Sequence, residues 1–254
     1  MTIFQAIILG LVQGLTEFLP ISSSGHLVLL SKVFGIKSNF VFFSIALHFA
    51  TLIAVLWHFR KEVWLVVKKP FGPLAVKLYI ATIPAIIVAL LFNDQIEKMF
   101  SGTLLPFCFM FTAVLLILTQ ICATKQKHKK KIDYKGALFM GFMQAVAIIP
   151  GISRSGSTIS GSVLAGYDKE ESAHFSFLMS VPIILASCAY EVLKIFKQGA
   201  GLIFPLQTIV SSLFAFLSGI FAIKLMLNIV KKVKFHYFSY YLIILSIISF
   251  IIYF

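Results

Sequence analysis

Apolar stretches long enough to cross a bilayer recur from one end of this chain to the other. A spanning helix needs about 20 mostly apolar residues, so a chain with this pattern folds within a membrane. The composition agrees, because 59% of the 254 residues are hydrophobic and only 12% are charged. Soluble domains are about half apolar and about a quarter charged. We predict an all-α polytopic membrane protein in which residues 1–254 form a single integral membrane domain.

Six stretches are uninterrupted and long enough to be transmembrane helices. The first apolar segment of the chain lacks a basic n-region and a small-residue cleavage site, so we expect it to remain in the mature protein. The predicted spans are residues 41–59, 76–92, 103–122, 173–193, 204–228 and 238–254.

Two further apolar segments, residues 3–31 and 136–165, are interrupted midway by proline, glycine and serine. The interruptions are Leu19-Pro-Ile-Ser-Ser-Ser-Gly25 and Pro150-Gly-Ile-Ser-Arg-Ser-Gly156. A broken helix leaves backbone groups that lipid cannot satisfy, so it is tolerated only inside protein or beside a wet cavity. We predict that each segment is a re-entrant helix pair.

The two interrupted segments resemble each other, which indicates an internal repeat. Gly10-Leu-Val-Gln13 precedes the first break, and Gly141-Phe-Met-Gln144 precedes the second at nearly the same spacing. Each half is then a re-entrant pair followed by three spans, and the odd number of spans inverts the second half. The predicted repeats are residues 1–122 and 136–254, joined by a basic loop at 123–135.

The chain carries a net charge of +13, which in a soluble protein would favour nucleic-acid binding. Here, fifteen of the 22 lysines and arginines fall in four short loops on one predicted side, at residues 60–77, 123–135, 166–172 and 229–236. The positive-inside rule makes that side cytoplasmic and places both termini outside. We therefore expect contacts with membrane lipids and no nucleic-acid partner. Arg154 is not explained in this way, because the surrounding sequence places it deep in the membrane.

The first break concentrates groups that are costly at membrane depth and are therefore functional candidates. Gln13 and Glu17 lie one helical turn apart on one face, and Ser22, Ser23, Ser24 and His26 follow within a few residues. A carboxylate, a hydroxyl and an imidazole can activate a nucleophile and move a proton. Ser22 and Ser24 are further candidates for binding substrate phosphate. The remaining histidines are expected to be structural or loop residues: His48, His58, His128, His174 and His236.

The second break has the features of an anion site. Its glycines allow close approach of backbone, its hydroxyls donate hydrogen bonds, and Arg154 offers a planar charged fork suited to phosphate oxygens. The half-helix that follows adds free N–H groups at its N-terminus. The run from Gly151 to Thr158 superficially matches a nucleotide P-loop, but Ser157 replaces the required lysine and no strand precedes it. We therefore exclude an NTPase.

These residues resemble the undecaprenyl-diphosphate phosphatases associated with bacitracin resistance. The resemblance rests on Gly14-Leu-Thr-Glu-Phe-Leu-Pro-Ile-Ser-Ser-x-Gly-His26 and Pro150-Gly-x-Ser-Arg-Ser-Gly-x-Thr-Ile-Ser160 and extends over nearly the whole chain. It implies hydrolysis of a C55 isoprenyl diphosphate to the monophosphate, which recycles the lipid carrier for cell-wall synthesis and confers bacitracin resistance. The matching catalytic positions are Glu17, Ser23 and His26, and the matching phosphate-binding positions are Ser153, Arg154, Ser155 and Thr158.

The sequence leaves several alternatives open. Gln13 stands where other members of that family have glutamate, so a Mg²⁺ or Ca²⁺ site would rest on Glu17 with Gln13 nearby; no organic cofactor is expected. Ser23 is the nucleophile candidate, with direct attack by water as the competing route, and Arg154 stabilises the phosphoryl group in either case. A flippase of isoprenyl phosphate lipids is the rival function, because inverted repeats are common in transporters. We expect a multi-pass protein of the bacterial inner membrane with an outward-facing site, and homo-oligomer formation is left open.

Overall fold

The computed structural model describes residues 1–36, 40–125, 130–197, 205–232 and 235–254. The described residues form helices, and their only β-type pairing is an isolated bridge between Lys130 and Tyr167. His128 and the rest of residues 126–129, within the predicted basic loop, lie outside the described part. The all-α prediction is confirmed. The helices are α1 (Ile3–Phe18), α2 (Ser23–Val33), α3 (Phe40–His58), α4 (Arg60–Lys68), α5 (Pro73–Leu91), α6 (Asn93–Met99), α7 (Leu105–Lys125), α8 (Tyr134–Val146), α9 (Arg154–Leu164), α10 (Lys169–Lys197), α11 (Leu206–Lys231) and α12 (His236–Tyr253).

Five described helices are long and apolar enough to cross a membrane, and a bent pair supplies a sixth span. The five are α5, α7, α10, α11 and α12, and the pair is α3 with α4, which meet at an angle of 85°. The five helices and α3 of the bent pair lie at the six predicted spans, so the polytopic prediction is confirmed. The stretch predicted as the loop 60–77 differs, because its first nine residues form α4, a helix with no buried residue.

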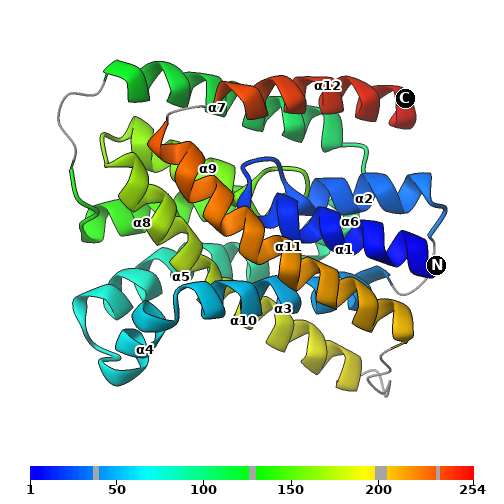
Figure 1. The fold of residues 1–254 in the computed structure, drawn as a ribbon, viewed down its shortest axis with the longest axis horizontal. Coiled ribbons are helices and arrows are strands. Elements are labelled where there is room, and N and C mark those ends of the chain that lie inside the picture. The colour runs from blue at the N-terminus through cyan, green and yellow to red at the C-terminus, as the bar shows by residue number, and fades with distance from the viewer. Residues whose placement is uncertain (37–39, 126–129, 198–204, 233–234) are drawn as a thin grey trace.

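The two predicted breaks lie between α1 and α2 and between α8 and α9. Figure 1 shows α1 running from the N-terminus into the molecule and α2 returning toward the same end. Each second helix begins with a serine cap: Ser22 Oγ accepts from the Gly25 N–H at 3.2 Å, and Ser153 Oγ accepts from the Gly156 N–H at 3.0 Å. The turns need left-handed backbone at Ser22 (φ 68°) and Gly151 (φ 97°). Both chain termini lie at one end of the molecule (Figure 1).

Helix contacts follow a symmetric pattern in the described residues. Helix α1 packs on α11 and α8 packs on α5, while α3 contacts α11 and α10 contacts α5. If α8, α10 and α11 correspond to α1, α3 and α5, all four contacts join one half to the other, and exchanging the halves turns α1–α11 into α8–α5 and α3–α11 into α10–α5. This exchange of partners is expected of two related halves. The boundaries at 1–122, 123–135 and 136–254 stay a prediction.

The glycines of the matched pre-break sequences bring backbones into contact. A Cβ on Gly10 would lie 2.2 Å from the Ser211 carbonyl oxygen of α11, and one on Gly141 would lie 2.7 Å from the Ala81 carbonyl oxygen of α5. Small residues permit such close helix packing where lipid provides no hydrophobic driving force. The two glycines therefore lock each broken segment onto a spanning helix of the other half.

Candidate active site

The two breaks touch each other inside the molecule. Ser155 Oγ donates to the Leu19 carbonyl oxygen at 3.0 Å, and the Gly151 N–H donates to Ser24 Oγ at 3.4 Å. A Cβ on Gly25 would lie 3.1 Å from Gly151 Cα. Segments that are far apart in the sequence therefore share one polar centre enclosed by apolar helices.

Glu17, at the end of α1, is the centre of this region. Its Oε1 accepts from Arg154 Nη2 at 2.6 Å, and its Oε2 accepts from Ser23 Oγ at 2.6 Å. Both side chains of the ion pair are largely buried, with 6% of the glutamate and 15% of the arginine exposed. The structure therefore brings three predicted residues, one carboxylate, one hydroxyl and one guanidinium, into a single hydrogen-bonded group.

Gln13 lies one turn before Glu17 and joins the same group. Its Nε2 donates to Glu17 Oε2 at 3.1 Å, as their spacing on one helix face predicts. The side chain is fully buried, yet its Oε1 has no hydrogen-bond partner in the described structure. Buried polar atoms are nearly always paired, so this oxygen is a candidate ligand atom.

Arg154 is held on two sides. Besides Glu17, it donates from Nη1 to the Ser176 carbonyl oxygen of α10 at 3.2 Å. The Ser176 hydroxyl lies 2.7 Å from Thr158 Oγ1, and Thr158 also donates to the Arg154 carbonyl oxygen at 2.8 Å. Ser176 lies in an apolar span and was not predicted to have a role, yet its carbonyl oxygen fixes the plane of the guanidinium.

The hydroxyls predicted to bind phosphate mainly contact protein groups. Ser153 Oγ caps α9 and lies 3.3 Å from Ser155 Oγ, while the Ser153 N–H donates to Thr112 Oγ1 at 3.2 Å. Ser22 Oγ caps α2 and lies 3.3 Å from Ser24 Oγ. These side chains shape the two breaks, and a direct contact with phosphate stays a prediction.

His26 lies in the first turn of α2 but has no contact with Glu17, Ser23 or Arg154 among its hydrogen bonds in the described structure. Its Nδ1 lies 2.7 Å from the Ser22 carbonyl oxygen, and its Nε2 lies 2.6 Å from the Tyr241 hydroxyl of α12. A carbonyl oxygen only accepts, so Nδ1 carries the proton and Nε2 accepts from Tyr241. The tyrosine ring also stacks on the imidazole. Tyr241, in the last apolar span, was not predicted to have a role.

His48 of α3 faces Glu17, although the sequence predicted only a structural role for it. Its Nε2 lies 3.7 Å from Glu17 Oε2, and 29% of its side chain is exposed. The only sequence signal was a histidine within an apolar span, which is more often structural. Among the described residues no three His, Cys, Asp or Glu side chains form a metal-binding group, so Glu17 and His48 stand as a pair.

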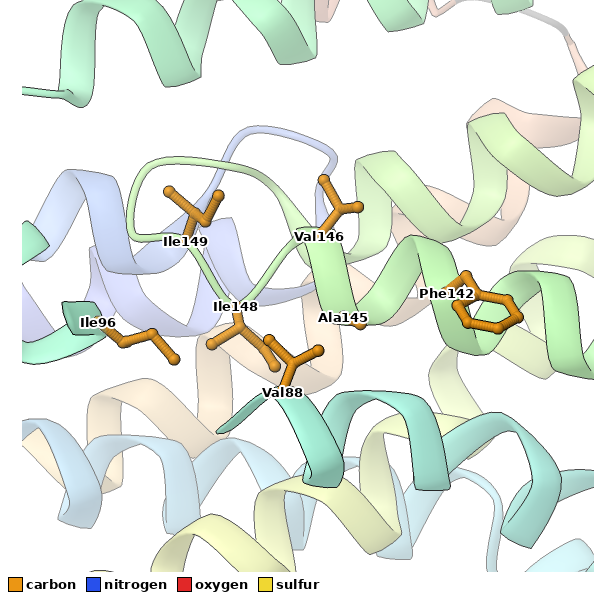
Figure 2. A pocket seen from close by; sticks show the side chains of 7 residues that line it. All are labelled: Val88, Ile96, Phe142, Ala145, Val146, Ile148 and Ile149. Atoms are coloured by element: carbon orange, nitrogen blue, oxygen red, sulfur yellow. The ribbon is translucent and has the colours of Figure 1, made fainter. Parts of the chain in front are cut away.

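An apolar groove of about 360 Å³ lies beside the second break and is separate from this centre. Figure 2 shows Ile148 and Ile149 of the break between the ends of α5, α6 and α8. None of the predicted site residues lines the groove, and its surface is almost entirely apolar. It therefore has no chemistry of its own. Its lining residues are Val88, Ile96, Phe142, Ala145, Val146, Ile148 and Ile149.

Comparison with known proteins gives matches over nearly the whole chain. The family model described as "Bacitracin resistance protein BacA" matches residues 6–248. An undecaprenyl-diphosphatase of Carboxydothermus hydrogenoformans is 44% identical over 250 residues, covering 97% of this chain and 96% of that protein. One of Halothermothrix orenii is 41% identical over 255 residues, covering 99% and 98%. One of Methanobrevibacter smithii is 38% identical over 273 residues, covering 98% and 97%.

Proposed function

The chain belongs to the bacitracin resistance protein BacA family, and on that premise we propose that it cleaves undecaprenyl diphosphate in the centre between its two breaks. It is an undecaprenyl-diphosphate phosphatase, as are its similar relatives. The products are undecaprenyl monophosphate, which returns to cell-wall synthesis, and inorganic phosphate. The observation that carries the location of the site is the contact of Glu17 with both Arg154 and Ser23.

Arg154 is proposed to bind the terminal phosphoryl group. Phosphoryl transfer depends on positioning and on neutralising charge over the phosphoryl oxygens, which a guanidinium does with two parallel donors. In the described structure one donor nitrogen is on Glu17 and the other on the Ser176 carbonyl. An incoming phosphate competes with Glu17 for the guanidinium. Substrate binding therefore releases the carboxylate at the moment when a base is needed.

Glu17 is the proposed proton acceptor. Ser23 Oγ already donates to its Oε2, and the same oxygen could receive the proton of a water in place of the serine. The attacking oxygen forms a bond to the terminal phosphorus, its proton passes to Glu17, and the bond to the bridging oxygen breaks to release the lipid monophosphate. If Ser23 attacks, a water must then hydrolyse the seryl phosphate. His26 is bound to Ser22 and Tyr241, so we assign it to positioning α2.

A divalent cation, Mg²⁺ or Ca²⁺, is part of the proposal. Phosphatases use such ions to neutralise phosphate oxygens. The residues present fit one, because Glu17 offers a carboxylate and Gln13 Oε1 is a buried oxygen without a partner. Both would hold the ion, and Arg154 would keep its place on the phosphoryl group.

The protein is a multi-pass membrane protein, and we propose that it lies in the bacterial inner membrane with the site open to the outside. The loop charges support this orientation. The substrate is itself a membrane lipid, so it reaches the site within the bilayer. A flippase is not favoured, since transport needs no hydroxyl hydrogen-bonded to a carboxylate beside the anion site.

The test is release of phosphate from undecaprenyl diphosphate by the purified protein in detergent, with Mg²⁺ or Ca²⁺ and with chelator. Turnover by the wild type is expected. A wild-type protein that is folded but releases no phosphate under any of these conditions would overturn the function.

A further inference from the structure

We propose that residues 60–72, which comprise α4 and the turn after it, form a docking surface that selects anionic phospholipids from the surrounding leaflet. The segment lies in the headgroup region on the side of the membrane where the basic loops lie, and its outward face contacts the lipid phosphates. The inference does not rest on the proposed function, because none of the residues of the active centre belongs to this segment.

The place of α4 between two spanning helices sets its depth. α3 crosses the membrane and ends at His58, and α5 begins the return crossing at Pro73. Spanning helices tilt on average by about 20° from the membrane normal, and α4 meets α3 at 85°. It therefore lies close to the membrane plane over about 13 Å, at a rise of about 1.5 Å per residue. Figure 1 shows α4 at the end of the molecule away from both termini.

Phe59, the residue between α3 and α4, holds the bend. Its side chain is only 2% exposed, and its ring centroid lies 4.8 Å from that of His174 and 6.3 Å from that of Phe177, both on α10. Val63 and Val66 pack against the same apolar core. α4 is thus fixed to the protein along one stripe, and its orientation does not depend on a bound lipid.

The opposite face of α4 combines cations with large apolar side chains. At about 100° per residue, four side chains lie about half a turn away from the two valines: Lys61, Trp64, Leu65 and Lys68. Trp64 is 58% exposed and Leu65 is 47% exposed. Lys68 Nζ lies 5.2 Å from the centroid of the Trp64 ring. Neither lysine pairs with a carboxylate in the described structure.

The turn after α4 continues this surface. Phe71 is 90% exposed, and Lys69 is exposed beside it. Glu62 is the one carboxylate of the segment, and it lies 3.6 Å from His174 Nε2 of α10. With four cations and this carboxylate, the segment has a net charge of +3. The cations are Arg60, Lys61, Lys68 and Lys69.

A face of this kind is stable at one depth. Ammonium groups are costly in hydrocarbon, and exposed aromatic rings are disfavoured in water. At the headgroup boundary the rings contact acyl chains while the ammonium groups contact phosphates. A zwitterionic phospholipid has no net charge to offer, whereas an anionic surface attracts each nearby lysine by about 1 kcal/mol, or about fivefold in occupancy. The unpaired lysines therefore favour anionic lipids.

The experiment uses the fluorescence of the chain's two tryptophans, Trp57 and Trp64. Trp57→Phe leaves only Trp64, on α4, and preserves the backbone carbonyl that accepts from Arg60. This protein is reconstituted in phosphatidylcholine vesicles with either phosphatidylglycerol or phosphatidylcholine brominated near the headgroup, at the same fraction. Bromine quenches a tryptophan that it contacts. We expect phosphatidylglycerol to associate at least about fivefold more tightly than phosphatidylcholine, and high salt to reduce this preference.

Lys61→Gln/Lys68→Gln in the same background should abolish the preference, so that both brominated lipids quench Trp64 equally. Lys32→Gln/Lys98→Gln is the matched control, because it removes the same charge at two exposed lysines outside the basic loops. It should keep the preference.

The inference is overturned if both lipids quench Trp64 equally in the parent protein, if the Lys61/Lys68 variant keeps the preference, or if the control loses it. Quenching by neither lipid would also overturn it, because α4 would then face water or another protein. None of these measurements involves undecaprenyl diphosphate. An inactive protein that prefers phosphatidylglycerol would contradict only the proposed function, and an active one without the preference would contradict only the docking surface.

Discussion

Arg154 Nη2 donates to Glu17 Oε1 at 2.6 Å, although the two residues lie 137 positions apart in the chain. The pair joins the second break to the first, and neither break is a complete site by itself. Because charges inside a membrane protein must be paired, the contact both holds the breaks together and keeps the groups that bind phosphate and accept the proton next to each other.

Replacing Arg154 removes the proposed phosphoryl clamp. Arg154→Ala should lower kcat/KM by about 10²–10³, the usual loss for one preorganised donor. Arg154→Lys keeps the charge but not the planar fork, and should recover only part of that loss. Phosphate release from undecaprenyl diphosphate measures both. Lys224→Ala is the control, because it removes a cation from another helix, α11, and should leave kcat/KM within about twofold. Near-normal activity of Arg154→Ala would refute the clamp.

Ser23→Ala separates the two chemical routes. If Ser23 is the nucleophile, activity should fall to the background, and wild-type protein quenched during turnover of substrate labelled in the terminal phosphate should retain label on the serine. If water attacks, about a tenth or more of the activity should survive, because the serine only orients Glu17. Protein mass spectrometry and phosphate release decide between these outcomes.

Glu17→Gln tests the ion pair as a structural element. Breaking a buried pair from one side costs about 3–5 kcal/mol, because the other charge is left uncompensated. We expect a lower unfolding temperature in detergent together with loss of turnover. Glu62→Gln, at a half-exposed pair with His174, should cost less than about 1 kcal/mol. Equal unfolding temperatures for the two variants would contradict the structural role.

Gly14→Ala tests the packing of the first broken segment. A Cβ at this position would lie 2.0 Å from Ser218 Oγ and 2.3 Å from the Ala215 carbonyl oxygen, so α1 must move away from α11. Overpacking typically costs about 1–3 kcal/mol, and kcat should fall as Glu17 shifts. Leu11→Ala, at an exposed position of α1, is the control. Thermal unfolding and turnover of both variants provide the comparison.

The membrane orientation can be tested with one added cysteine at a time in a Cys122→Ser background, where the two remaining cysteines, Cys108 and Cys188, are buried. Lys98→Cys, in α6, should react with a membrane-impermeant maleimide on intact cells. Lys61→Cys, in α4, should react only after the membrane is opened. The reverse pattern would invert the orientation and place the site on the cytoplasmic side.

The sequence predicted the spans and the breaks well, because lipid imposes a strong and simple rule on composition. It also predicted that Glu17, Ser23 and Arg154 belong to one site, since polar groups at membrane depth are rare. α4 was missed because its basic residues were interpreted only as loop charges, although its pattern is amphipathic.

The structure adds residues that sequence could not single out. His48, Ser176 and Tyr241 each lie in an apolar span and contact the site only through the packing of helices. In the sequence, a single histidine or serine in such a span looks the same whether its side chain faces lipid, an apolar helix interface or a carboxylate. Only the three-dimensional arrangement separates His48 from the other histidines, and only the orphaned oxygen of Gln13 marks that residue as more than a helix-surface amide.

The distance in sequence between the two breaks also governs the order of events during synthesis. Glu17 emerges from the ribosome long before Arg154, so α1 and α2 enter the membrane while the carboxylate still lacks its partner. The docking surface of α1, on α11, is made later still. The first broken segment therefore stays without its final packing partner until the second half of the chain has been made.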